Sequence, residues 1–193
     1  MAEMDVGGQP VIGFATAAEC ESWFERHHAE HRGFWMKIGK AGGTGSVTYP
    51  EALQVALCFG WIDGQKRGLD EQHWLQRFTP RGPRSKWSQI NRDKAEALIA
   101  SGAMRPAGLR EVDRARSDGR WAAAYESQSN ATVPADLAEA LAADPEAAAF
   151  FATLSGVNRY AILYRIHDAK RPETRARRIE KFVAMCREHK TIH

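Results

Sequence analysis

Alternating apolar and polar residues, the pattern of a half-buried β-strand, occur only in the first part of this chain. Residues 34–40 (FWMKIGK) alternate in this way, and two further strand-like runs flank a turn near residues 68–70. Beyond Trp121 the pattern is absent, and prolines suited to the first position of a helix replace it. We therefore predict an α+β fold that is mostly helical, with a small antiparallel sheet before about Pro80 and an all-helical C-terminal part.

Capping signals mark the predicted helices. Residues 16–19 (TAAE) and 48–51 (TYPE) are capping boxes, in which Thr bonds the N3 amide and Glu reaches back to the cap amide. Gly60, Gly102 and Gly119 stand where helices are expected to end. The helix that follows Thr48 is apolar nearly all round, so we expect it at the centre of the fold.

The chain has 193 residues, enough for one good core or two small ones. Residues 1–10 are interpreted as a flexible tail, because they are rich in glycine and polar side chains. Residues 127–134 (SQSNATVP) are the one linker-like stretch. The predicted organisation is an α+β region over residues 11–125, holding the candidate site, and a helical region over residues 126–193.

Charge distribution and cysteine usage indicate the compartment of the protein and argue against some kinds of site. The net charge is +3, and residues 121–158 contain no Lys or Arg, so positive charge gathers in residues 77–94 and 165–181. Three widely spaced cysteines without a CxxC motif argue against a disulfide framework and a zinc ribbon. The N-terminal residues lack the basic and apolar pattern of a signal peptide, and no apolar run is long enough to span a membrane. We expect a cytoplasmic protein with buried thiols.

Residues 78–92 (FTPRGPRSKWSQINR) are the most unusual stretch of the chain. Their prolines and glycine forbid regular structure, while arginines and a tryptophan surround the start of a helix. Guanidinium groups, a helix N-terminus and a flat apolar ring favour an anionic or aromatic small ligand. We predict one concave ligand-binding site, with the strand that bears Asp63 as its opposite wall. Its candidate residues are Trp61, Asp63, Arg77, Arg81, Ser85, Trp87 and Asn91.

The same residues also have ordinary structural explanations. Ser88 or Asn91 can cap the helix, Asp63 can fix a turn, and the arginines can pair with Asp70 and Glu71. Elsewhere, His27 and His31 lie one helical turn apart but have no third ligand nearby, so no metal site is predicted. Cys58 has no neighbouring base that would make it a nucleophile.

The second basic cluster lies in residues 169–181 (AKRPETRARRIEK). Its arginines could contact phosphates, but the same segment carries an apolar stripe that includes Ile179, Phe182 and Val183. We interpret this segment as an amphipathic helix with a mainly structural role.

Three motifs together resemble the YdeI/OmpD-associated family of bacteriocin-protection proteins. They are residues 56–64 (ALCFGWIDG), 77–91 (RFTPRGPRSKWSQIN) and 169–181 (AKRPETRARRIEK). The resemblance runs from about Phe14 to Met185, and the helical part from about Pro134 onward resembles the region that defines the family. It implies a role in tolerance of toxic peptides or in envelope stress, and it brings no reaction, cofactor or catalytic residue.

Three hypotheses of function follow. The leading one is a cytoplasmic stress-protection or bacteriocin-protection protein that binds an anionic or aromatic small molecule between Asp63 and Asn91. The second is an enzyme that uses the same pocket, with Asp63 as general base and Arg81 as electrostatic stabiliser. The third is a weak nucleic-acid binder that uses both basic clusters.

Overall fold

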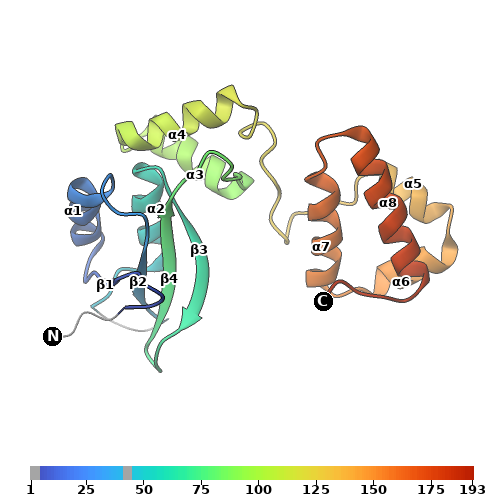
Figure 1. Ribbon diagram of the computed structural model, residues 1–193, viewed down its shortest axis with the longest axis horizontal. Coiled ribbons are helices and arrows are strands. Elements are labelled where there is room, and N and C mark those ends of the chain that lie inside the picture. The colour runs from blue at the N-terminus through green and yellow to red at the C-terminus, as the bar shows by residue number, and fades with distance from the viewer. Residues whose placement is uncertain (1–4, 41–44) are drawn as a thin grey trace. The chain divides into compact units, whose positions relative to one another are not determined.

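The computed structural model describes residues 5–40 and 45–193, so residues 1–4 of the predicted tail and residues 41–44 of the predicted loop lie outside the described residues. The chain divides into two compact units, Met1–Ala124 and Tyr125–His193. Figure 1 shows their elements. The N-terminal unit contains β1 (Val11–Gly13), α1 (Ala17–His27), β2 (Phe34–Gly39), α2 (Tyr49–Cys58), β3 (Trp61–Gly68), β4 (His73–Pro80), α3 (Gln89–Ala100) and α4 (Pro106–Ser117). The C-terminal unit contains α5 (Ala135–Ala142), α6 (Pro145–Thr153), α7 (Gly156–His167) and α8 (Pro172–Arg187).

The sheet has the strand order β1-β2-β4-β3. The predicted α+β class, the β3–β4 hairpin and the all-helical C-terminal part are confirmed. The prediction of a wholly antiparallel sheet was wrong at one edge, where β1 pairs with β2 in parallel. The reason is the connection, because α1 crosses over between these two strands and returns the chain in the same direction. With three residues, β1 is too short to show an alternating pattern.

The residues before β1 are held against the sheet. Asp5 bridges Pro10, and the indole nitrogen of Trp35 donates to the carbonyl of Val6 over 3.2 Å. The backbone nitrogen of Trp35 donates to the carbonyl of Pro10 over 2.9 Å. These contacts cover the part of the sheet that Trp35 occupies.

A β-bulge interrupts the pairing of β3 with β4 between Asp63 and Lys66. Gln76, which is 3% exposed, compensates for the lost ladder bonds. Its side-chain amide donates to the carbonyls of Gly64 (2.9 Å) and Gln65 (3.2 Å). A buried amide is stable only when it is hydrogen-bonded, and the bulge supplies its acceptors.

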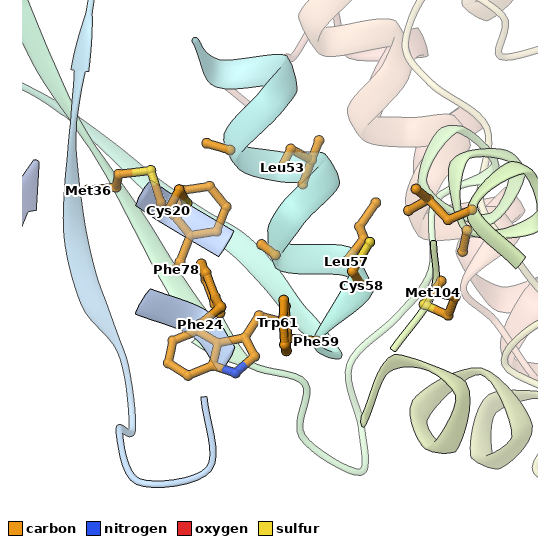
Figure 2. Close-up of a cluster of buried hydrophobic side chains, with 14 of the residues drawn as sticks. Cys20, Phe24, Met36, Leu53, Leu57, Cys58, Phe59, Trp61, Phe78 and Met104 are labelled. Carbon is orange, nitrogen blue, oxygen red and sulfur yellow. The ribbon is translucent and has the colours of Figure 1, made fainter. Parts of the chain in front are cut away.

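The core of the N-terminal unit lies between the sheet and the pair α1 and α2 (Figure 2). Phe24 from α1, Phe34 from β2 and Phe78 from β4 are all fully buried. The predicted caps form: the Glu19 amide donates to the Thr16 hydroxyl (3.2 Å), and the Thr48 amide donates to the Glu51 carboxylate (2.9 Å). Helix α2 buries five of its ten residues, in line with its predicted central position.

Gly108 permits a close approach between α4 and the end of α2. A Cβ atom at this position would clash with the sulfur of Met104 and the carbonyl of Cys58, and would lie 2.8 Å from the carbonyl of Leu57. Real Cβ atoms essentially never approach backbone oxygen so closely. The backbone amide of Arg105 donates to the carbonyl of Cys58 over 3.2 Å and stabilises the contact between α4 and α2. Glycine is therefore required for packing rather than for chain flexibility.

The C-terminal unit has a separate apolar core built from all four of its helices. Ile179, Phe182 and Val183 are buried in it, which confirms that the basic helix packs. Two arginines of α8 form ion pairs with aspartates of other segments of this unit. Arg175 donates to the carboxylate of Asp136 through two nitrogens, and Arg187 pairs with Asp144. Hydrogen bonding to Arg175 holds the pKa of Asp136 below its ordinary value.

Candidate functional site

Trp61 belongs to the core rather than to a ligand platform. It is 1% exposed, and its ring packs edge-on against Phe24 with centroids 5.2 Å apart. Figure 2 shows the two side chains next to each other in the core. Its indole nitrogen donates to the carbonyl of His28 over 3.2 Å. Both the ring and its donor are occupied by the protein, so Trp61 stabilises the junction of α1 with β3.

Asp63 has a partner that the sequence did not suggest. The hydroxyl of Tyr49, in the first turn of α2, donates to its carboxylate over 2.8 Å. Burial and this carboxylate both raise the pKa of the tyrosine, with burial the larger cause. Asp63 therefore links β3 to α2, on the sheet face that the helices cover.

Arg77 lies on the other face of the sheet. Side chains alternate along β4, and Phe78 points into the core, so Arg77 points away from it. Its Nε donates to the side chain of Gln9 over 2.9 Å. The structure does not bring Arg77 together with Asp63 or with the loop that follows β4.

The loop between β4 and α3 is built around a stack of Arg81 on Trp87. The guanidinium carbon of Arg81 lies 3.5 Å from the centre of the indole ring, and Nη1 donates to the carbonyl of Lys86 over 3.1 Å. Arg81 is 5% exposed and Trp87 is 2% exposed. A cation over an indole face is stabilising, and more so when both are shielded from water. Two of the predicted site residues, Arg81 and Trp87, thus lie in contact and stabilise the loop from within.

Ser85 and Asn91 complete the predicted set. The hydroxyl of Ser85 accepts from the amide of Gly82 over 2.9 Å, which closes the tight turn that exposes Arg84. Asn91 is buried in the first turn of α3, where its backbone N–H donates to the hydroxyl of Ser88 over 3.2 Å. Ser88 is accordingly the N-cap of this helix.

Arginines from the end of α4 and from the turn after it bond to the loop, and they were not predicted from the sequence. Arg114 donates to the carbonyl of Arg81 (3.2 Å), and Arg120 donates to the carbonyl of Ser85 (2.8 Å). Trp121 packs edge-on against Trp87 at 4.8 Å, and the guanidinium of Arg116 lies 5.1 Å from the Trp121 ring. The two indoles thus meet edge to face, with the Arg81 guanidinium over the first ring and the Arg116 guanidinium near the second.

The charges of these arginines are only partly neutralised. Arg114 pairs with Glu111, and Arg120 pairs with Asp118, whose pKa it lowers. Over residues 5–40 and 45–193, Arg84 and Arg116 form no ion pair, and both are exposed. We call this area, from Arg81 to Trp87 together with residues 114–121, the basic loop surface.

Cys58 lines a separate hollow of about 240 Å³ beside Arg105, yet its thiol is a poor nucleophile. Burial raises the pKa of Cys58 to about 11, and burial raises that of Cys20 to about 12. Thiol reactivity follows the thiolate fraction. Burial therefore disfavours the thiolate form of Cys20 and Cys58 at neutral pH.

At pH 8 we expect Cys58 of the folded chain to react with Ellman's reagent about a hundredfold more slowly than Cys58 of the urea-unfolded chain, because burial raises its pKa to about 11 and the thiolate fraction falls tenfold for each unit by which the pKa is raised. The release of thionitrobenzoate measures both rates. Rapid labelling of Cys58 in the folded chain would contradict this expectation and would restore it as a candidate nucleophile.

Membrane-spanning helices and metal-ligand clusters are absent from residues 5–40 and 45–193. None of the helices in the described ranges combines the length and the apolar character needed to cross a bilayer. Among the same residues, no three His, Cys, Asp or Glu side chains gather as metal ligands would. The rings of His27 and His31 lie 5.9 Å apart, and both pack on Trp23.

The elements define a two-unit α+β protein, in which a helix-covered mixed sheet is followed along the chain by a four-helix unit. The basic loop surface belongs to the first unit. Residues 12–111 match the family model described as a domain of unknown function, DUF8412, and residues 130–189 match OmdA, described as Bacteriocin-protection, YdeI or OmpD-Associated. The first match covers more than half of the chain, so the chain belongs to the DUF8412 family and carries an OmdA domain at its C-terminal end.

The predicted family resemblance is confirmed by the OmdA match, although that match is shorter than expected. The motifs at residues 56–64 and 77–91 lie in the DUF8412 match, and the motif at residues 169–181 lies in the OmdA match. No curated protein and no solved structure matches the chain.

Proposed function

We propose that this chain is a cytoplasmic bacteriocin-protection-type protein whose N-terminal unit binds a small anionic ligand on the basic loop surface, so that of the predicted site residues Arg81, Ser85 and Trp87 belong to the site and Asp63 does not. The observation that carries the proposal is the stack of Arg81 on Trp87 at 3.5 Å. This stack fixes an irregular loop in one conformation and leaves Arg84 on its exposed turn. A preorganised loop binds a ligand with less loss of conformational entropy than a loop that must first be ordered.

Electrostatics favours an anion over an uncharged aromatic ring. The rings of Trp61 and Trp87 are buried, so neither offers a free face for stacking. Arg84 and Arg116, in contrast, are exposed guanidinium groups whose planar forks suit phosphate and carboxylate oxygens. The ligand class that best fits is therefore a small phosphate or carboxylate.

The free thiols of the three cysteines support a cytoplasmic location. Cys20, Cys58 and Cys186 are all free thiols, and all are buried. Free cysteines are common in a reducing compartment and unusual in an oxidising one.

The test is titration of the ¹⁵N-labelled full chain with inorganic pyrophosphate, followed by NMR. We expect shifts confined to residues 81–88 and 114–121, and binding that weakens as sodium chloride is added. The double variant Arg84→Ala, Arg116→Ala should weaken binding by about tenfold or more, since each lost charge-assisted hydrogen bond contributes roughly 1.5–3 kcal/mol.

Arg110→Ala is the matched control, because Arg110 is also an exposed arginine of α4. Equal binding by the double variant and the native chain would refute the proposal. Tight binding of a single-stranded oligonucleotide with a steep salt dependence would favour the nucleic-acid hypothesis in its place.

A further inference from the structure

The C-terminal unit contains a cavity of about 430 Å³ that the basic loop surface does not involve. It lies between the segment of residues 128–131 and one face of α7. Gln128, Ser129, Arg159 and Tyr160 supply its polar wall, and Leu154 and Leu163 supply its apolar wall. This volume is within the usual range for small-molecule sites, about 300–1,000 Å³.

A hydrogen bond from Tyr160, which lines the cavity, to Glu126, just before the lining segment, helps to shape it. The hydroxyl of Tyr160 donates to the carbonyl of Glu126 over 2.8 Å and so holds the preceding segment against α7. The carboxylate of Glu126 accepts from the amide of Thr132 over 3.1 Å, which keeps the segment curved. Residues 156, 160 and 163 are spaced three and four apart, so they share the face of α7 that borders the cavity.

Arg159 carries the only charge among the cavity-lining residues, and it is partly buried. One nitrogen donates to the carbonyl of Ala152 over 3.0 Å, and its guanidinium carbon lies 5.4 Å from the ring of Phe151. Its buried Nε has no acceptor among the described residues. In the described parts of the chain no carboxylate pairs with it, whereas Arg175 and Arg187 of the same unit each hold an aspartate.

A partly buried cation without a counter-charge is costly, and an anion in the adjoining cavity would remove that cost. We infer that this cavity binds a small carboxylate with an apolar body, about the size of an acylated amino acid. The carboxylate pairs with Arg159, the apolar side chain rests on Leu154 and Leu163, and Gln128 and Ser129 bond the amide. This inference does not depend on the function proposed for the N-terminal unit.

The test uses two probes that differ only in charge, N-acetylleucine and N-acetylleucinamide, added to the ¹⁵N-labelled full chain. We expect N-acetylleucine to shift the amides of residues 128–131 and 156–163, and the amide probe to bind about tenfold more weakly or not at all. The matched variants are Arg159→Gln and Arg177→Gln, which remove the same charge from α7 and from the exposed side of α8. Only the first should reduce the affinity.

Gln128→Trp provides an independent variant. Gln128 is an exposed residue at the edge of the cavity, so a large ring there fills the site while the core of the unit is left intact. We expect it to abolish the shifts even though Arg159 remains. The inference is overturned if the two probes bind equally, if N-acetylleucine leaves both segments unshifted, or if neither Arg159→Gln nor Gln128→Trp weakens binding.

Discussion

Replacing Phe182 with alanine is expected to destabilise the C-terminal unit by about 3 kcal/mol, as truncation of a buried aromatic side chain does. Phe182 lies on α8, is 5% exposed, and belongs to the apolar core that all four helices share. Removing its ring leaves a cavity that rigid helices fill only in part, and the lost contacts add to the lost transfer free energy. The effect should therefore be large in a unit of this size.

Hydrogen exchange of the full chain, resolved by segment with mass spectrometry, measures this effect where it occurs. Protection of α5 to α8 should fall in Phe182→Ala, and the loss of opening free energy should be shared by the helices that contact it. Arg177→Gln is the control on the same helix, and it should change stability by no more than about 0.5 kcal/mol. If instead Arg177→Gln abolished binding of a ligand without altering stability, a functional role for the basic face of α8 would have to be restored.

The helices could be predicted from the sequence because their limits are encoded locally. Capping boxes at Thr16 and Thr48 and helix-start prolines such as Pro145 and Pro172 act within one turn, so a short window of sequence contains the whole signal. The hairpin has the same local character. Strand β1 could not be found in this way, since its pairing depends on a partner beyond α1.

The candidate site was only partly predictable, because it combines local and distant contacts. Arg81 and Trp87 are six residues apart in one loop, and the prediction that they belong together needed only that loop. Trp121, in the turn after α4, packs against Trp87, and Arg116, in α4, lies near the Trp121 ring. No local sequence pattern predicts the contact with Trp87, because about thirty residues separate Arg116 and Trp121 from the loop. The side of the sheet that Arg77 occupies follows from strand alternation once Phe78 is assigned to the core.

Gly108→Ala is expected to destabilise the N-terminal unit by about 2 kcal/mol, although helix propensity alone would predict a gain of about 1 kcal/mol for this change. The added methyl group would meet the sulfur of Met104 and the carbonyls of Cys58 and Leu57. The methionine side chain can move aside. The two carbonyls belong to the last turn of α2, and they can yield only if α4 moves away. Opposite signs for the two effects make the experiment decisive.

Gly64→Ala is the matched control for Gly108→Ala. Both variants add one methyl group, but at Gly64 the nearest atom would be the carbonyl oxygen of Arg77 at 3.8 Å, an ordinary contact. Urea unfolding followed by tryptophan fluorescence reports on the N-terminal unit, because all six tryptophans lie before residue 125. Gly64→Ala should remain within about 1 kcal/mol of the native chain. If Gly108→Ala were as stable as the native chain or more so, α4 would not be held against α2 by close backbone contact, and the position of residues 114–121 beside the loop would need another cause.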